Sequence, residues 1–178
     1  MVALKNLGQR ICIIGPGSNG KSTLAKSLGD ALNIKVCYLD QLAHIPYTKW
    51  QRIDKKHLEA EHKKFLEEND KWIIEGNYSS LMKDRFRVAT SIIWLDYTGP
   101  GSLFRYIKRS VINSPGRPGN LPGAKQQFSW KQVKYMLFTA PKNRVKYKKL
   151  VAESNATLVY IDSFHLLKKY YRAWNIKK

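Results

Sequence analysis

Short apolar runs alternate with amphipathic stretches from one end of the sequence to the other. Runs rich in Val, Ile, Leu and aromatic residues predict five strands, at 10–14, 35–39, 72–75, 91–96 and 157–162. Apolar residues at helical spacing predict helices at 22–32, 54–68, 80–87, 102–112, 130–138, 142–154 and 164–174. Asp54 is the expected N-cap of the second helix, and Pro141 is expected to break the helical path after residue 138.

This alternation predicts an α/β fold in three layers, with a five-stranded parallel sheet and helices on both of its faces. The 178 residues contain no internal repeat and no linker, so we expect one domain over 1–178. Ligands of such sheets bind outside the carboxyl ends of the strands. Four polar features follow or end a predicted strand and should therefore share that edge: the segment 15–22, Asp40, Glu75 and Asp96. Asp96 suits a helix cap equally well.

The segment 15–22, GPGSNGKS, matches a phosphate-binding loop. It meets the pattern G-x-x-x-x-G-K-[ST], and it stands between a predicted strand and a predicted helix, as the motif requires. Its backbone N–H groups and the helix N-terminus favour an anion. We expect Lys21 to reach the β- and γ-phosphates of ATP and Ser22 to bind Mg²⁺. The predicted nucleotide-binding residues are Gly15, Pro16, Gly17, Ser18, Asn19, Gly20, Lys21, Ser22 and Thr23.

A kinase needs an acceptor site and a carboxylate in addition to this loop. Asp40 follows the second predicted strand and is the expected catalytic carboxylate, orienting an acceptor hydroxyl or holding Mg²⁺ through water; the alternative is a helix or turn cap. Glu75, Asn77 and Tyr78 are the expected substrate-binding residues after the third strand, with a simple strand-to-helix turn as the alternative. Arg85 is a further candidate, for an anionic group on the acceptor.

A cationic clamp for the transferred phosphoryl group is expected from Arg105 and Arg109, which are four residues apart on one helix face. The Gly/Pro-rich loop at 113–124, which carries Arg117, has a composition that excludes regular structure. We expect it to belong to a lid-like insertion at about 105–129. The alternative for the two helix arginines is an ordinary solvated surface.

The net charge of +19 changes the picture of possible partners. No acidic residue occurs between Asp96 and Glu153, whereas that stretch carries twelve Lys or Arg. Such a field attracts nucleotides, phosphorylated metabolites or nucleic acid, unless it is simply a solvated surface. Trp130, Tyr135 and Tyr147 lie within the stretch, so nucleic-acid binding stays open.

The remaining features favour a soluble protein of the cytoplasm without a structural metal. No apolar run approaches the roughly 18 residues that cross a bilayer, and the first residues lack the apolar region of a signal peptide. Cys12 and Cys37 lie in predicted strands and are expected to be buried free thiols. None of the four histidines has metal-ligand spacing, and all four are expected at the surface or in loops: His44, His57, His62 and His165.

Several of these stretches together resemble the bacterial topology-modulation proteins, which are adenylate-kinase-like P-loop proteins often described only as candidate kinases. The resemblance covers nearly the whole chain. Its most specific part is WIIEGNYS at 72–79, and it is carried also by GPGSNGKSTLAKSLG, Leu39-Asp40, Arg85, SIIWLDY at 91–97, the run 105–109, FSW at 128–130 and Pro141. It implies the nucleoside-monophosphate-kinase fold with a lid, and ATP and Mg²⁺ as ligands. Aspartate is the residue expected where Glu75 stands. Adenylate kinases carry Gly-Phe-Pro-Arg where this chain has Gly76 to Ser79, which points away from a nucleoside monophosphate as acceptor.

The function expected from the sequence is a small-molecule kinase that transfers the γ-phosphoryl group of ATP to a nucleoside, a nucleotide or another hydroxylated or phosphorylated acceptor. The alternative is a nucleic-acid-associated ATP-binding regulator or polynucleotide kinase that uses the basic stretch 97–152. A P-loop ATPase or GTPase switch is weaker, since no Asn-Lys-x-Asp guanine motif is present. The acceptor, the roles of the individual carboxylates and the oligomeric state are left open.

Overall fold

The expected sheet is present in the computed structural model, which describes residues 1–97, 100–112, 116–123 and 128–177, without the side chains of 100, 109, 131, 132, 136, 140 and 141. Five parallel strands lie in the order β2-β3-β1-β4-β5. Their bounds are β1 Arg10–Ile14, β2 Val36–Tyr38, β3 Trp72–Glu75, β4 Ser91–Leu95 and β5 Thr157–Ile161. Each strand lies within a residue or two of its sequence-based prediction.

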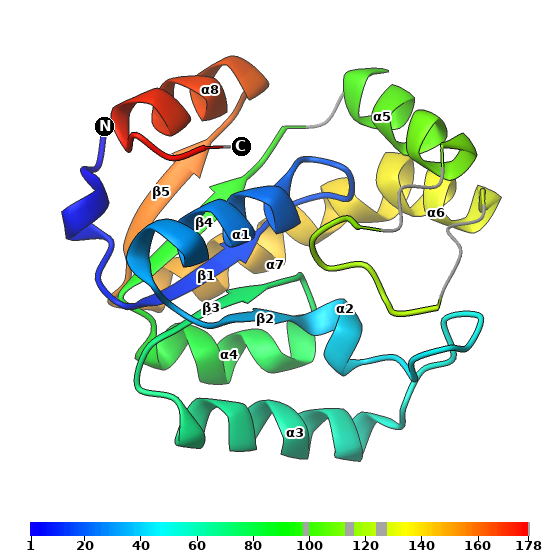
Figure 1. Cartoon of the computed structure of the whole chain (residues 1–178), viewed down its shortest axis with the longest axis horizontal. Helices are drawn as coiled ribbons and strands as arrows, with labels where there is room; N and C mark the ends of the chain where they lie inside the picture. The colour runs from blue at the N-terminus through cyan, green and yellow to red at the C-terminus, as the bar shows by residue number, and fades with distance from the viewer. Residues whose placement is uncertain (98–99, 113–115, 124–127, 178) are drawn as a thin grey trace.

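Helices cover both faces of the sheet, as Figure 1 shows. The bounds are η1 Leu4–Asn6, α1 Lys21–Leu32, α2 Leu39–Leu42, α3 Lys55–Glu68, α4 Ser79–Val88, α5 Pro100–Val111, α6 Trp130–Lys134, η2 Tyr135–Thr139, α7 Ala140–Ala152 and α8 Phe164–Ala173. Asp54 caps α3 as expected, its carboxylate accepting a hydrogen bond from the backbone N–H of His57. In the described part of the chain, no helix combines the length and the apolarity needed to cross a bilayer.

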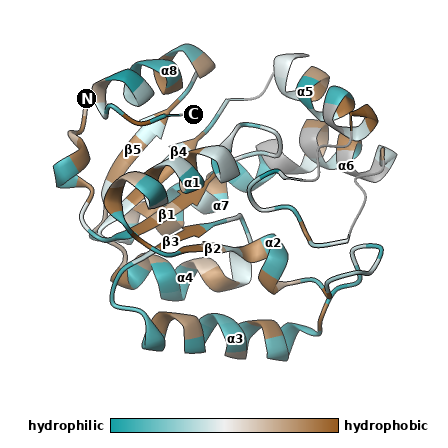
Figure 2. Cartoon of the chain, in the orientation of Figure 1, coloured by the Kyte–Doolittle hydropathy of each residue, from teal (hydrophilic) through white to brown (hydrophobic). Residues whose placement is uncertain are grey.

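The core has two halves, because successive residues of each strand point to opposite faces of the sheet. Ile11 and Ile13 of β1 pack with α1 and α8 on one face. Cys12 and Ile14 pack with α3, α4 and α7 on the other. Figure 2 shows the strands largely in the hydrophobic colour, whereas α3 at the outside is mostly hydrophilic. The expected three-layer α/β architecture is therefore confirmed.

Parallel register brings the carboxyl ends of the central strands to one edge of the sheet. Ile13 of β1 is aligned with Glu75 of β3, and Ile14 is aligned with Trp94 of β4. Tyr38, at the end of β2, is aligned with Glu75 as well. The phosphate-binding loop, Glu75 and Asp40 thus start from neighbouring positions, as the sequence predicted.

Two expectations about helices need correction. Pro141 does not break the helical path: a π-helical turn, η2, joins α6 to α7, and Pro141 is the second residue of α7. Proline is tolerated in a first helical turn, where its missing N–H would have no intrahelical partner. The four-residue helix α2, which contains Asp40, was not predicted, because so short an element leaves no periodic pattern.

One histidine is also placed differently from the prediction. His62 lies on α3 and is 1% exposed, so it is neither a surface nor a loop residue, whereas His44 lies in the loop after α2, as expected, although it is buried. Burial and the nearby Arg85 lower the pKa of His62 to about 4, which keeps its imidazole neutral in the folded protein at neutral pH. Cys12 and Cys37 are buried free thiols, as predicted.

The described part of the Gly/Pro-rich loop, residues 116–123, packs back against α2 and the loop that follows it. Gln41 donates a hydrogen bond from Nε2 to the carbonyl oxygen of Asn120, at 2.7 Å. The backbone N–H of Tyr47 donates to the carbonyl oxygen of Pro122, at 2.8 Å, and Leu121 is buried. Gly119 has a φ of +73°, and a Cβ added there would lie 3.2 Å from the Cβ of Ser22. This loop therefore passes directly over the start of α1.

Candidate functional site

The phosphate-binding loop leaves β1 at Gly15, under close steric constraint. Gly15 has a φ of +141°, and a Cβ added to it would stand 2.2 Å from the carbonyl oxygen of Leu95. Only glycine lets the chain pass that close to β4. Gly20, with a φ of +86°, then stands at the N-cap of α1, so that Lys21 is the first residue of the helix. The loop has the strand–loop–helix context that the motif requires.

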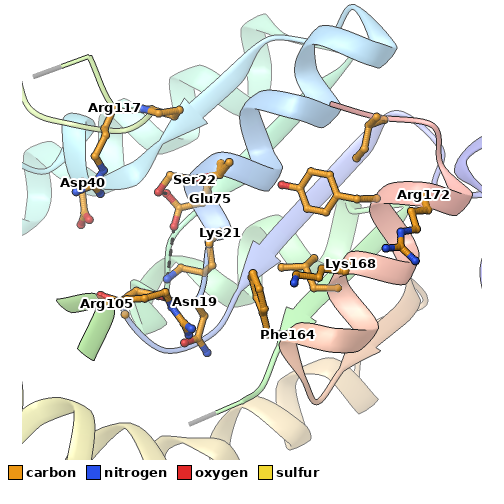
Figure 3. A pocket seen from close by; sticks show the side chains of 18 residues that line it. Asn19, Lys21, Ser22, Asp40, Glu75, Arg105, Arg117, Phe164, Lys168 and Arg172 are labelled. Carbon is orange, nitrogen blue, oxygen red and sulfur yellow. Dashed lines mark hydrogen bonds and ion pairs between the residues drawn. The ribbon is translucent and has the colours of Figure 1, made fainter. Parts of the chain in front are cut away.

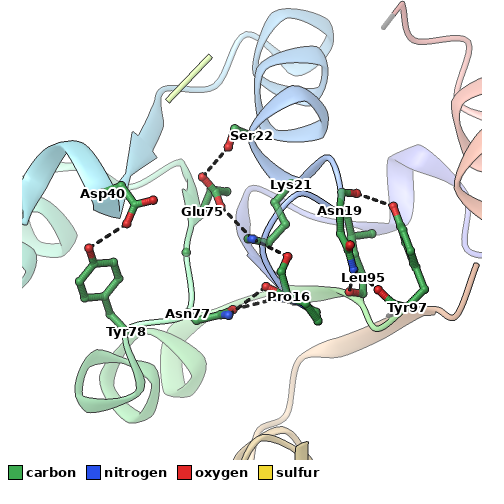
Figure 4. A network of polar contacts seen from close by, with 12 residues as sticks. Pro16, Asn19, Lys21, Ser22, Asp40, Glu75, Asn77, Tyr78, Leu95 and Tyr97 are labelled. Atoms are coloured by element: carbon green, nitrogen blue, oxygen red, sulfur yellow. Dashed lines mark hydrogen bonds and ion pairs between the residues drawn. The ribbon is translucent and has the colours of Figure 1, made fainter. Parts of the chain in front are cut away.

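Lys21, Ser22 and Glu75 meet at the edge of the sheet, as Figure 4 shows. The Lys21 Nζ atom donates to the carbonyl oxygen of Pro16 at 3.0 Å and lies 3.7 Å from Glu75 Oε1. The Ser22 hydroxyl donates to Glu75 Oε2, at 3.0 Å. Burial raises the pKa of Glu75, and the Lys21 ammonium and the Ser22 hydrogen bond offset part of that rise. A buried carboxylate thus stands beside the two side chains expected to meet phosphate and metal.

Asp40 faces the cleft from α2 and is held by Tyr78. The Tyr78 hydroxyl donates to Asp40 Oδ1 at 2.8 Å, and the carboxylate of Asp40 is otherwise exposed (Figure 4). Burial raises the pKa of Tyr78, and the adjacent Asp40 raises it further, so the phenol keeps its proton and acts as a donor. Tyr78 therefore orients the expected catalytic carboxylate and is not among the described residues that line the cleft.

Asn77 has a different place from the one predicted. Its Oδ1 atom accepts the N–H of Gly15 at 3.0 Å, and its Nδ2 atom donates to the carbonyl oxygen of Gly15 at 2.9 Å (Figure 4). Both ends of the amide are thus engaged on the backbone of the phosphate-binding loop. Because Asn77 is not among the described cleft residues, its expected contact with the acceptor is corrected to support of this loop.

Arg85 also lies away from the acceptor position that the sequence predicted for it. Its side chain is 0% exposed and lies in the core near Cys12 and Cys37, and burial lowers its pKa. One guanidinium nitrogen donates to the carbonyl oxygen of Gly76, at 2.6 Å. Its side chain is on the buried face of α4, so it cannot contact an acceptor anion in the cleft as expected. Arg85 fixes the backbone that follows Glu75.

The expected cationic clamp is only partly described. Arg105 of α5 donates from Nε to the carbonyl oxygen of Ser18, at 3.0 Å, and its guanidinium lies 5.4 Å from the centre of the Phe164 ring. The side chain of Arg109 lies outside the described part of the chain. Arg117, from the loop over α1, lines the cleft, and burial lowers its pKa. Arg105 and Arg117 therefore enter the cleft from two different segments (Figure 3).

A buried network that the sequence did not reveal connects the phosphate-binding loop to α5. Asn19 is 1% exposed; its Nδ2 atom donates to the carbonyl oxygens of Leu95 and Tyr97, and its backbone oxygen accepts from the Tyr97 hydroxyl. The Ser102 hydroxyl donates to Asn19 Oδ1, at 2.7 Å. The sequence motif leaves the residue at this position free, so spacing alone gave Asn19 no role beyond membership of the loop.

Asp96 lies outside this cleft. Its carboxylate is buried, and Oδ2 accepts from Nε of Arg144 at 2.9 Å and from the Tyr160 hydroxyl at 2.7 Å. These bonds tie α7 to β4 and β5. Among the described residues, Asp96 therefore links helix and strands and does not line the cleft with Asp40 and Glu75.

One cleft of about 600 Å³ unites the remaining features. Residues 17–23, Asp40 and Glu75 line one part of it, and Arg105 and Arg117 line another. Its far wall, which the sequence did not predict, comes from α8 and the segment after it (Figure 3): Phe164, Leu167, Lys168, Tyr171, Arg172 and Ile176. Phosphate-binding backbone, two carboxylates and several cations thus face one space of a size that suits a nucleotide.

Comparison with known proteins supports the fold. No protein-family model matches the sequence, and no curated protein matches it. The expected membership in the topology-modulation proteins is thus not confirmed. Among solved structures, a gluconokinase from Sinorhizobium meliloti 1021 is similar with a TM-score of 0.55 and 14% identity, over 95% of this chain and 90% of that one.

Two further solved structures agree with this similarity. A shikimate kinase from Bacteroides thetaiotaomicron has a TM-score of 0.54 and 16% identity over 94% of both chains. A sugar kinase from Janibacter sp. HTCC2649 has a TM-score of 0.51 and 11% identity, over 94% of this chain and 95% of that one. At these identities the likeness concerns the fold. The chain has the α/β P-loop fold of small-molecule kinases.

Proposed function

We propose that this protein is an ATP-dependent phosphotransferase that moves the γ-phosphoryl group of ATP to a hydroxyl group of a small acceptor. The observation that carries the proposal is the meeting of Lys21, Ser22 and Glu75 in the cleft that Asp40 also lines. Lys21 and Ser22 would suffice for a loop that only bound phosphate. A buried carboxylate beside them, with a second one facing the same space, is what phosphoryl transfer requires.

The oxygen donors in the cleft fit Mg²⁺. Ser22 Oγ and Glu75 Oε2 are 3.0 Å apart, and a cation beside Glu75 would stabilise the ionised form that burial disfavours. Mg²⁺ takes few protein ligands, since waters and substrate phosphates complete its coordination. This agrees with the described residues, among which no group of three or more His, Cys, Asp or Glu is placed to hold a metal. When bound, the ion neutralises charge on the β- and γ-phosphates.

Asp40 is the proposed general base. The acceptor hydroxyl gives its proton to the Asp40 carboxylate, and the acceptor oxygen forms a bond to the γ-phosphorus. The bond from that phosphorus to the bridging oxygen breaks, and ADP leaves with the bonding electron pair. Tyr78 supports this step, because its 2.8 Å hydrogen bond fixes one oxygen of Asp40 and leaves the other for the acceptor.

Positive charge in the cleft would stabilise the transferred group. Lys21 lies at the loop, and Arg117 reaches the same space from the segment that packs over Ser22. Fixed cations in a site shielded from water stabilise developing phosphate charge more than exposed ones do. Arg105 lies between Ser18 and Phe164, which suits contact with the nucleotide, and Arg109 stays a candidate of the sequence.

The nucleic-acid alternative finds less support. Tyr147 is 6% exposed and packs edge-to-face against Trp94 in the core, so it offers no face to a base. Trp130 is exposed, but its ring already packs edge-to-face against the ring of Phe128. The cleft instead suits a small nucleotide and a hydroxylated acceptor such as a nucleoside, a nucleotide or another hydroxylated or phosphorylated metabolite.

The test is transfer of label from [γ-³²P]ATP with Mg²⁺ to a panel of sugars, sugar acids, nucleosides and nucleotides. The proposal expects one acceptor class to be labelled by the wild type and none by Lys21→Met, which keeps the fold but loses the loop's cation. Lys26→Met is the matched control, because Lys26 lies on the same helix, is exposed and pairs with Asp30 instead. ATP binding without labelling of any acceptor would reject the proposal.

A further inference from the structure

Three cleft-lining residues of α8 follow one another at intervals of four: Phe164, Lys168 and Arg172. Residues at this spacing share one face of a helix, and each step of four rises about 6 Å along the axis. The aromatic ring therefore begins a row that continues with two cations along the wall of the cleft. Figure 3 shows Lys168 and Arg172 on the α8 side, across from Lys21 and Glu75.

No described carboxylate neutralises the charges along this row. In the described part of the chain, neither Lys168 nor Arg172 forms an ion pair with a carboxylate. Lys168 Nζ lies 5.0 Å from the centre of the Phe164 ring, which also has the Arg105 guanidinium at 5.4 Å. The two carboxylates that line the cleft, Asp40 and Glu75, belong to its other end.

ATP alone does not account for these cations. With its phosphates on Lys21 and Ser22, an ATP molecule would extend toward Arg105 and α8 with its ribose and base, which are uncharged. A phosphate monoester on the ribose would bring nearly two negative charges to this wall at neutral pH. Arginine and lysine side by side are the usual partners of such a group.

We propose that the α8 row is a second anion subsite, formed by Lys168 and Arg172, that recognises a nucleotide carrying a phosphate on its 2′- or 3′-hydroxyl. The inference rests on the proposed function, because it takes the 5′-phosphates to lie on the phosphate-binding loop. It adds that the nucleotide held by the loop, the phosphoryl donor, is preferred in a form that carries this extra ribose phosphate, and that the preference comes from α8 and not from the loop.

Isothermal titration calorimetry tests the subsite with three nucleotides in the presence of Mg²⁺: ADP, 2′-phospho-ADP and 3′-phospho-ADP. For the wild type, one of the phosphorylated forms should bind about tenfold more tightly than ADP, equivalent to ~1.4 kcal/mol. The preference should fall at least threefold in Lys168→Met and in Arg172→Met, and it should weaken as salt is raised, because both side chains are exposed.

Lys169→Met is the matched control, since Lys169 is exposed on the same helix but is not among the described residues that line the cleft. It should keep the full preference. A further titration of ADP in the presence of inorganic phosphate distinguishes a phosphate carried by the nucleotide from a free anion bound independently. The proposal expects that inorganic phosphate does not tighten ADP binding. Equal binding of all three nucleotides, or a preference that survives in the double variant Lys168→Met/Arg172→Met, would overturn the subsite alone. No binding of ADP would overturn the proposed function itself.

Discussion

The hydroxyl of Ser22 donates a 3.0 Å hydrogen bond to Glu75, from the first turn of α1 to the last residue of β3. The two residues are 53 positions apart in the sequence and meet because β1 and β3 are parallel neighbours. This bond, together with Lys21, keeps a carboxylate buried at the phosphate-binding loop. Its consequences for pH and for binding can be measured.

Glu75 should make stability depend on pH with a definite sign. Burial raises its pKa in the folded protein, so the native state keeps this proton to a higher pH than the unfolded state does. The contribution of Glu75 to the free energy of unfolding is therefore greatest below its unfolded pKa and falls as pH rises through its folded pKa. The stability of the wild type minus that of Glu75→Gln, from urea unfolding at pH 4 to 8, should decline. A difference in the free energy of unfolding that grows with pH would contradict a raised pKa of Glu75 in the folded protein.

Asn77 should support nucleotide binding without touching the nucleotide. Asn77→Ala removes two hydrogen bonds to the backbone of Gly15, each worth ~1 kcal/mol, so ATP affinity should fall by up to about 30-fold. Asn69→Ala is the control, because that amide bonds to Phe65 at the end of α3, away from the cleft. Calorimetric titration with Mg·ATP provides the measurement, and unchanged affinity in Asn77→Ala would refute the supporting role.

Gly15 should tolerate no side chain. Gly15→Ala puts a Cβ 2.2 Å from the Leu95 carbonyl oxygen at a φ of +141°, so one of the two strands must move. We expect the free energy of unfolding to fall by at least ~2 kcal/mol, as for other strained backbone positions. Gly116→Ala, where an added Cβ would meet nothing within 4 Å, should leave stability unchanged within ~0.5 kcal/mol. Equal stability of the two variants in urea unfolding would show that the close approach is absent.

His62 should limit stability in mild acid. Its pKa is lowered to about 4 in the folded protein, so the unfolded state binds this proton first as pH falls from about 6.5. Stability is thus lost between about pH 6.5 and 4, by up to ~3 kcal/mol from this residue. His62→Leu should flatten the urea-unfolding profile over that range. His57→Leu, at an exposed position of the same helix, should keep the wild-type slope; if both variants keep it, His62 is not the cause.

The sequence predicted those features that depend on local pattern. Runs such as RICII and SIIWL fixed the strands, and the order of strands and helices implied the parallel sheet that gathers Gly15, Asp40 and Glu75 at one edge. The motif located Lys21 and Ser22 because its glycines are needed at defined spacings. The strands, their order and the phosphate-binding loop depend on residue periodicity and on where glycine is needed, and both can be seen in a single sequence.

The sequence did not predict which charged side chains are buried in the core and which line the cleft. Arg85 lies on a helix whose inward face is set by packing against the sheet, so its burial could not be inferred from charge. The α8 wall is another example, since Lys168 and Arg172 have an ordinary amphipathic pattern and reach the cleft only because α8 packs beside α1. Pro141 is an example of another kind, because the rule that proline ends a helix does not apply in the first turn of a helix, which is where Pro141 lies.

The most direct test of the proposed phosphotransferase is a comparison of the wild type with Asp40→Asn, in Mg·ATP binding and in γ-phosphoryl transfer to the acceptor found in the panel. Asp40 lines the cleft but makes no described contact with the phosphate-binding loop, so calorimetry should give the same ATP affinity for both proteins. The rate of transfer should fall by a factor of at least ~10² in Asp40→Asn, because the variant cannot accept the acceptor's proton. Transfer at the wild-type rate by Asp40→Asn, with ATP binding intact, would contradict the account.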